Sequence, residues 1–176
     1  MRNTTDLLAQ YAAYHRDRRN IATHLVGVPL IVFGVGVLLA RPAFALGGLA
    51  LSPAWILFAI TAAWYLTRGD LVVGAAVSAV VGVLIALAHG VAYGSTAGWL
   101  AWGLGSFVVG WIIQFVGHHF EGRKPAFVDD LAGLLIGPMF VVAEVVFALG
   151  LCQPLHAEIV RRAGPTLIRE RRQTPA

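Results

Sequence analysis

Histidine is the residue type in this sequence whose positions point most directly to chemistry. Four of the six histidines fall in two polar segments, residues 11–29 and 114–125. Neutral imidazole is the commonest metal ligand in proteins. Three ligands drawn from imidazole and carboxylate groups leave open positions on a metal ion, as in a non-haem Fe(II) oxygenase or a zinc hydrolase. The six are His15, His24, His89, His118, His119 and His156.

The spacing within the first segment sets a condition on any shared ligand. His15 and His24 are nine positions apart. On one straight helix they would face opposite ways, about 13.5 Å apart along the axis. They can share a metal only if the chain turns between them, and we expect that turn at Asn20. Asn20 and His24, four positions apart, share a helix face.

The second segment places a carboxylate beside a histidine. His118 and Glu121 are three positions apart and share a helix face, with Gln114 one turn earlier. His119 is rotated by about 100° from His118 and needs a different role. His15, His24 and His118 are the candidate ligands if the two segments meet on one side of the membrane.

The remaining ionisable groups have simpler interpretations. We interpret His89 and His156 as hydrogen-bonding or anchoring residues, and His119 as a solvated neighbour. Glu144 lies in an apolar run, where an ionisable group is costly and either functional or part of the bracing of the bundle. The arginines near both ends of the chain suit contacts with anionic lipid headgroups.

The composition is that of a membrane protein. Of the 176 residues, 58% are hydrophobic and 12% are charged, about half the charged fraction of an average soluble domain. The net charge of +4 comes from arginines clustered at the ends, and no interleaved basic surface suggests nucleic-acid binding. A single cysteine, Cys152, excludes an internal disulfide.

The apolar runs predict an all-α, polytopic membrane bundle of about four to six membrane helices. We expect an N-terminal amphipathic helix over residues 5–19, capped by Thr5, and a basic, partly disordered tail over residues 152–176. The expected apolar stretches are residues 25–40, which begin upstream near Asn20, 43–66 with an interruption at Ser52-Pro53, 71–93, 97–116, and 131–151 with Gly137-Pro138 inside.

Topology brings the two histidine segments together. With the arginine-rich N-terminus in the cytoplasm, four spans return residues 117–130 to the same side. A fifth full span would move the arginine-rich tail outside. Residues 131–151 are therefore expected to form a re-entrant or broken helix, unless Ser52-Pro53 splits the second stretch and changes the count. Within residues 71–93, the small residues Gly74, Ser78 and Gly82 predict close helix packing.

At these positions the chain resembles the 2-hydroxy fatty acid dioxygenases, a family first recognised in the yeast endoplasmic reticulum and with many bacterial members. The resemblance covers about residues 7–145 of the sequence. Its residues are Tyr14-His15-Arg16 with Asn20, His24, Gly27 and Pro29, then Gln114-Phe115-Val116-Gly117-His118 with Glu121 and Pro125-Ala126, and then Leu135-Ile136-Gly137-Pro138.

The resemblance implies an Fe(II)-dependent enzyme of fatty acid α-oxidation, which uses O2 to convert a 2-hydroxy fatty acid to a fatty acid one carbon shorter. The family's histidines correspond to His15, His24 and His118, and we extend this catalytic metal site to Glu121. The expected substrate-binding residues are Tyr11, Tyr14, Asn20 and Gln114.

The same resemblance suggests where the protein works. Its alanine-, glycine- and arginine-rich composition is similar to that of the bacterial members, so we expect a bacterial inner-membrane protein with its metal site on the cytoplasmic side. Residues 1–151 would form a single membrane-embedded catalytic domain, followed by the tail. The expected partners are the 2-hydroxy fatty acid, O2 and the lipid bilayer, with no nucleic acid.

Two other classes of function fit the same sequence. A non-enzymatic membrane transporter or scaffold with interfacial histidines predicts no bound metal and tolerance of His→Ala changes. A zinc-dependent lipid hydrolase predicts bound zinc and no O2 consumption.

Overall fold

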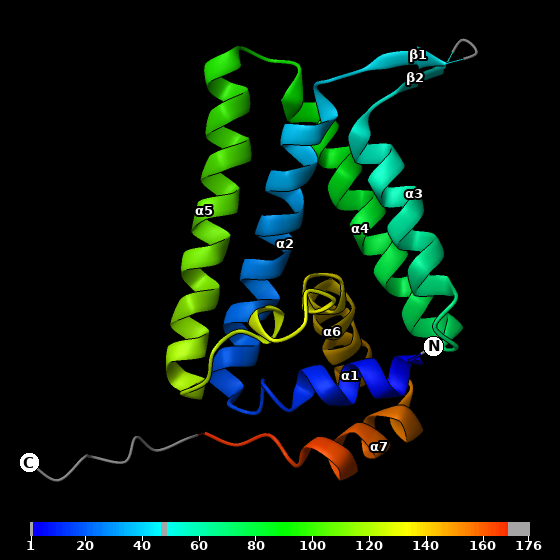
Figure 1. The fold of residues 1–176 in the computed structure, drawn as a ribbon, viewed down its shortest axis with the longest axis vertical. Helices are drawn as coiled ribbons and strands as arrows, with labels where there is room; N and C mark the ends of the chain where they lie inside the picture. Colours follow the sequence, from blue (N-terminus) through cyan, green and yellow to red (C-terminus); the bar gives the residue numbers. More distant parts are fainter. Residues whose placement is uncertain (1, 47–48, 169–176) are drawn as a thin grey trace, which may run out of the picture.

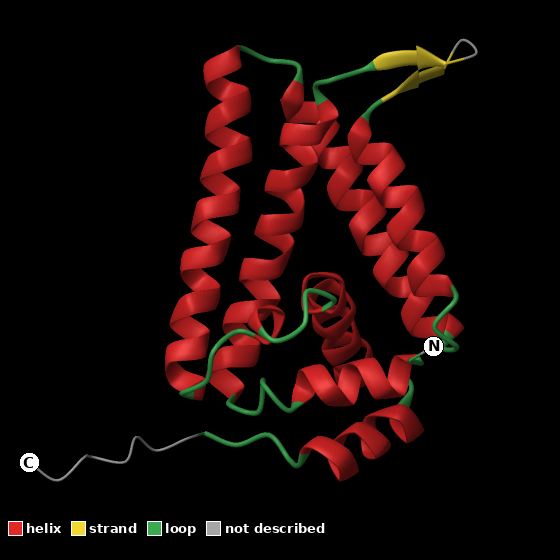
Figure 2. Ribbon diagram, in the orientation of Figure 1, coloured by secondary structure: helices red, strands yellow, loops and turns green. Residues whose placement is uncertain are grey.

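A computed structural model describes residues 2–46 and 49–168 of the chain. Helices dominate these residues, which confirms the predicted all-α fold (Figure 2). The elements in chain order are α1 (Thr4–Ala12), α2 (Arg18–Ala40), β1 (Phe44–Leu46), β2 (Leu49–Leu51), α3 (Pro53–Leu66), α4 (Leu71–Ala92), α5 (Thr96–Glu121), the 3-10 helix η1 (Ala126–Val128), α6 (Gly133–Ala148) and α7 (Gln153–Ala163).

The long helices form an upright bundle, while α1 and α7 lie across its lower end and α6 is seen end-on (Figure 1). By length and composition, α2, α4 and α5 can each cross a membrane, and the bent pair of α6 and α7 would make a fourth span. Helix α3 is apolar but only 14 residues long. The count reaches the predicted range only when the bent pair is included.

Glycines bring α2 and α5 into backbone contact. A Cβ atom added to Gly110 would lie 2.7 Å from the carbonyl oxygen of Gly27, and one added to Gly34 would lie 2.7 Å from the carbonyl oxygen of Gly103. Only glycine permits so close an approach of two membrane helices. The two helices that carry His24 and His118 are thus held together along their length.

The small-residue stripe on α4 packs against α3, as predicted. A Cβ atom on Gly74 would lie 2.8 Å from the carbonyl oxygen of Tyr65, and one on Gly82 would lie 3.1 Å from the ring of Phe58. The hydroxyl of Ser78 donates to the carbonyl of Gly74 within α4. The α3–α4 pair therefore forms the second half of the bundle.

The turn between the first two helices occurs earlier than predicted. Helix α1 ends at Ala12, and Asp17 caps α2 by accepting a hydrogen bond from the backbone of Arg19. Asn20 lies within the first turn of α2, so the expected break at Asn20 was wrong. Asn3, not Thr5, caps α1. The turn over residues 13–17 still satisfies the condition for His15 and His24 to meet.

The apolar stretch over residues 43–66 was expected to form one kinked span or two half-helices, but the structure has two short strands before α3. Strands β1 and β2 pair antiparallel, with Phe44 opposite Leu51. The stretch contains Gly47 and Gly48, and each glycine costs about 1 kcal/mol in a helix interior. Helix α3 begins at Pro53, where proline suits the first turn.

The C-terminal part also differs from the prediction. Helix α6 continues through Pro138 and is not broken there. The carbonyl of Leu135, one turn before Pro138, accepts a hydrogen bond from the hydroxyl of Tyr65. The chain bends by 119° between α6 and α7. Residues 153–163, predicted to lie in a partly disordered tail, form α7, which is paired to α1 by Arg162 and Asp6 at 2.8 Å. Residues 169–176 of that tail lie outside the described residues.

Candidate metal centre

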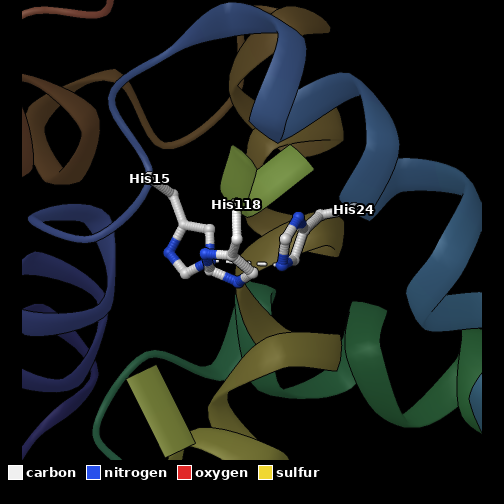
Figure 3. A group of neighbouring side chains, drawn as sticks. All are labelled: His15, His24 and His118. Atoms are coloured by element: carbon white, nitrogen blue, oxygen red, sulfur yellow. Dashed lines mark hydrogen bonds between the residues drawn. The ribbon is translucent and has the colours of Figure 1, made fainter. Parts of the chain in front are cut away.

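Three histidines from two helices and one turn converge inside the lower end of the bundle. His15 follows α1, His24 lies on α2 and His118 lies on α5, and the rings point toward one another (Figure 3). One ring nitrogen from each lies within 4.8 Å of the other two. The side chains are buried, with exposed fractions of 0%, 0% and 6%. The predicted meeting of the two polar segments is therefore found in the structure.

Backbone carbonyls set the tautomers of two of these rings. Nδ1 of His15 lies 2.8 Å from the carbonyl oxygen of Tyr11, and Nδ1 of His24 lies 2.9 Å from that of Asn20. Because a carbonyl oxygen only accepts, each Nδ1 carries the proton and each Nε2 presents a lone pair.

The resulting donor set fits a metal ion. The two Nε2 atoms of His15 and His24 lie 3.2 Å apart, and two lone pairs at that distance require a proton or a cation between them. Burial, and next the repulsion that a protonated His24 would exert, lower the pKa of His15 well below its ordinary value, which disfavours a proton on His15. Nδ1 of His118 is also buried and has no hydrogen-bond partner within residues 2–46 and 49–168. Three buried neutral imidazoles suit zinc, copper, iron or nickel.

Glu121 holds the turn that carries His15. One carboxylate oxygen, Oε2, accepts hydrogen bonds from the backbone amides of Arg16 and Asp17 at 3.0 and 2.8 Å, and from the side-chain amide of Asn20 at 3.2 Å. Gly122, with φ of 68°, ends α5 directly after it. The group of three histidines does not include Glu121, and its role as a ligand stays a prediction.

Tyr11 packs the first histidine in place. Its ring is stacked on His15, with centroids 4.2 Å apart and an interplanar angle of 8°, and Phe140 packs against both rings. Burial raises the pKa of Tyr11 above its ordinary value, so its hydroxyl stays protonated and is able to donate.

A small cavity of about 50 Å³ adjoins the centre. Among its lining residues, Tyr11, Gln114 and His118 carry polar groups that can reach a ligand. Two of the four predicted substrate-binding residues therefore line the space beside the histidines.

The other two predicted substrate-binding residues lie elsewhere. Asn20 is fully buried and bound to Glu121. The hydroxyl of Tyr14 donates to Asp129 at 2.9 Å, and this hydrogen bond raises the pKa of Tyr14. Neither residue lines the small cavity. Their contacts therefore favour a structural role over direct binding of the substrate.

The histidines outside the centre have ordinary partners. His89 is hydrogen-bonded to Ser52 at 2.9 Å, His119 is exposed, and His156 is stacked on Phe147. Glu144 lines a separate cavity of about 300 Å³ with Arg18 and His156. These positions agree with the interpretation of His89, His119 and His156 as residues outside the metal site.

Sequence reasoning missed two supports of the His15 turn. Asp17 has no exposed side-chain surface and caps α2, and an aspartate just before a helical run was an available signal. Residues 164–167 also bind this turn: Leu167 donates to the carbonyl of Arg16 and accepts from the amide of Arg18, at 2.8 and 2.9 Å. No local pattern predicts a pairing between residues so distant in the chain.

Fold and site together define a helical membrane protein with a buried tri-histidine centre at one end. A model of the family described as 2-hydroxy-palmitic acid dioxygenase Mpo1-like matches residues 1–149. Over 156 residues the chain is 33% identical to the 2-hydroxy-palmitic acid dioxygenase MPO1 of Saccharomyces cerevisiae, with 86% of this chain and 84% of the yeast protein covered. No solved structure gives a significant match. The chain belongs to the Mpo1-like family, which confirms the resemblance seen in the sequence.

Proposed function

We propose that this protein is an Fe(II)-dependent dioxygenase of fatty acid α-oxidation, which converts a 2-hydroxy fatty acid to a fatty acid one carbon shorter with O2. The observation that carries the proposal is the buried group of His15, His24 and His118. The yeast relative is named for dioxygenase activity on 2-hydroxy-palmitic acid. Three neutral imidazoles alone also suit zinc. Zinc has no redox chemistry, so a reaction with O2 requires a redox-active metal, and we propose iron.

His15, His24 and His118 would hold the metal. A bound Fe(II) ion supplies electrons and open positions at which substrate oxygen atoms and O2 meet. In both His15 and His24, Nδ1 donates a hydrogen bond to a backbone carbonyl oxygen, which leaves the lone pair on Nε2 facing the centre. This second set of bonds fixes ring orientation and raises ligand basicity.

The small cavity supplies groups for the polar end of the substrate. The Tyr11 hydroxyl and the Gln114 amide both line it next to His118, and each can donate a hydrogen bond to a carboxylate. Holding the substrate's carboxylate and 2-hydroxyl in one orientation is a large part of what a protein contributes to such a reaction. Burial of all three histidines keeps bulk water from the centre.

The reaction balances without an added reductant. A 2-hydroxy acid and O2 together contain the atoms of the shortened acid, CO2 and water. The bond between the carboxyl carbon and carbon 2 breaks, and carbon 2 becomes the new carboxyl carbon. Four electrons leave the substrate and four are accepted by O2. One O2 should therefore be consumed for each shortened acid released.

The decisive experiment compares metals and products. The protein is purified in detergent without oxygen and loaded with Fe(II) or Zn(II), and the bound metal is measured. It is then given 2-hydroxypalmitate and O2. We expect the C15 acid only from the iron-loaded protein, with equal amounts of O2 consumed. Confirmed iron occupancy without product would exclude the proposed activity. Ester or amide cleavage by the zinc-loaded protein would favour the hydrolase.

We also propose that the metal centre lies at the cytoplasmic side of a bacterial inner membrane. Arg16 and Arg19 flank the start of α2, and Arg123 and Lys124 follow α5 at the same end of the bundle. Positive charges of this kind mark cytoplasmic ends of spans.

Thiol labelling tests this orientation in a Cys152→Ser background. Lys124→Cys should react with a membrane-impermeant thiol reagent only after cells are opened, whereas Tyr93→Cys should react in intact cells. The reverse pattern would exclude this orientation.

A further inference from the structure

A second and larger cavity adjoins the small cavity beside the histidines. Its volume is about 400 Å³, and α2, α3, α4, α5 and α6 all contribute to its walls. The two cavities share five lining residues, so one begins where the other ends: Ile31, Val32, Trp111, Leu134 and Pro138.

The walls of the large cavity are almost entirely hydrocarbon. Apart from the shared Trp111, its polar side chains are Thr61 and Tyr65. Both hydroxyls already donate to backbone carbonyls, Thr61 to Phe58 at 3.0 Å and Tyr65 to Leu135 at 2.9 Å. A polar ligand would find little to bind there, whereas an alkyl chain would not have to displace a hydrogen bond.

The cavity has a length as well as a volume. On α3 its lining runs from Ala54 to Tyr65, which is about 16 Å at 1.5 Å per residue. Helix α3 begins at the upper end of the bundle, and α5, which carries His118 in its last turn, ends at the lower end (Figure 1). The far end of the cavity is lined by Ala54 and Ile85. Protein interiors have few voids larger than a water molecule, and this one has the size of a ligand pocket.

We propose that the large cavity binds the acyl chain of the substrate and limits the chain length that the enzyme accepts. This inference rests on the proposed function, because it takes the polar end of the substrate to lie in the small cavity. The acyl chain then passes Trp111 and Leu134 and extends along α3 and α4 toward Ala54 and Ile85. Occupancy by a bilayer lipid tail is the alternative that the test separates.

Selection by this cavity is steric. A substrate in the bilayer already has its chain in an environment as apolar as leucine, so moving it into the cavity yields little extra hydrophobic stabilisation. The wall instead excludes chains that are too long. A mismatch of one methylene in such a pocket changes relative rates by about 10-fold or more.

Two neighbouring valines on α4 provide a matched test. Val81 lines the cavity and is 8% exposed, whereas Val80 is 43% exposed on the outside of the helix. In the iron-loaded enzyme, Val81→Phe should lower kcat/KM for 2-hydroxypalmitate at least about 10-fold and change that for 2-hydroxydecanoate less than about twofold. Val80→Phe should change neither by more than about twofold. Equal losses for both chain lengths in Val81→Phe would overturn the proposal.

An enlarging variant guards against a folding defect in Val81→Phe. Ile85 lines the far end of the cavity, and Ile85→Ala should extend it. We expect Ile85→Ala to raise kcat/KM for a 2-hydroxy acid of 20 carbons relative to 2-hydroxypalmitate by about threefold or more. An unchanged ratio would contradict a cavity that limits chain length.

A labelling experiment gives a readout that does not need turnover. The iron-loaded protein is irradiated without O2 in the presence of a 16-carbon 2-hydroxy acid that carries a diazirine at carbon 10. We expect cross-links at Phe58, Val81 or Ile85, and competition by 2-hydroxypalmitate but not by excess phospholipid. Cross-links at Val80, Val83 or Leu87, or equal competition by phospholipid, would overturn the proposal. Correct labelling without any shortened product would count against the proposed function alone.

Discussion

Two histidine environments at opposite ends of the bundle begin in the same way and end differently. His89 binds the carbonyl of Ile85 through Nδ1, just as His24 binds that of Asn20, in each case four residues earlier. At His89 the free Nε2 meets the hydroxyl of Ser52, which is able to donate. At His24 the Nε2 meets the Nε2 of His15, which carries a lone pair.

This difference distinguishes the end of the bundle at which we propose the metal site. A local backbone bond fixes the tautomer in both places, so the local pattern alone does not distinguish structure from chemistry. The partner of the second nitrogen does. The hydroxyl of Ser52 completes the hydrogen bonding of His89, so no ligand is required there. At His24, the lone pairs of neighbouring histidines face one another and favour a bound cation.

The strongest test of this comparison removes one histidine from each environment. His24→Ala should lower both bound iron and product formation by at least about 100-fold, because it deletes a direct ligand. His89→Ala should retain iron and keep activity within about threefold. Metal analysis and product assays on detergent-purified protein measure both effects. A loss of iron in His89→Ala would remove the distinction between the two ends.

A second test asks how Glu121 contributes to the centre. Since its carboxylate binds the amides of Arg16 and Asp17, Glu121→Ala should weaken iron binding by about 10- to 100-fold, the range seen for groups that orient metal ligands. Glu121→Gln keeps one acceptor oxygen and should lose less. Iron titration measures both. If the two variants lose iron equally and completely, Glu121 is a fourth ligand.

A third test pushes α2 and α5 apart without changing any polar side chain. In Gly110→Ala the new Cβ would lie 2.7 Å from the carbonyl oxygen of Gly27, whereas at Gly105 on the same helix there is nothing within 4 Å. We expect Gly110→Ala to cost about 1–3 kcal/mol of stability and to weaken iron binding about 10-fold. Gly105→Ala serves as the control, and thermal melting in detergent with iron titration gives the readout. Equal behaviour of the two variants would show that the glycine contact does not position the histidines.

The smallest effect is expected at the His89 end. Ser52 caps α3 and also donates to His89, so Ser52→Ala should cost about 1 kcal/mol for the cap and about 1 kcal/mol or more for the unpaired imidazole. Ser95 caps α5 without a histidine partner in the described structure, and Ser95→Ala should cost only the first amount. Melting temperatures measure the difference, and activity should be unchanged in both.

The sequence predicted the long helices and the membership of the centre better than it predicted the turns. Helices α2, α4 and α5 were visible because a lipid-facing helix requires a long uninterrupted apolar run. Strands β1 and β2 were missed because a short apolar run has no period that separates strand from helix. Asn20 was expected to be the break, but Asp17, an equally good capping residue, is the N-cap of α2.

For the site, topology predicted that His15, His24 and His118 meet, since four crossings return both polar segments to one end. The role of Glu121 was not accessible in the same way. Its spacing from His118 suggested a shared metal, and that role stays a prediction. Its Oε2 also accepts hydrogen bonds from the backbone amides of Arg16 and Asp17 and from the side chain of Asn20, in a turn that was predicted at the wrong residue. Contacts to backbone groups depend on the fold of the turn and leave no pattern of residue types.

The bonds between residues 164–167 and the His15 turn have a consequence for the order in which the protein is made. The guanidinium of Arg16 donates to the carbonyl of Gly164, which is 148 positions later in the chain. Domains begin to fold during synthesis, at about 5–20 residues per second. The helices that carry His24 and His118 can therefore come together while later residues are still being added, but the turn that carries His15 gains its last support only when nearly all of the described chain has left the ribosome. The tri-histidine group that we propose as the metal site is therefore fully held in place only late in the synthesis of the chain.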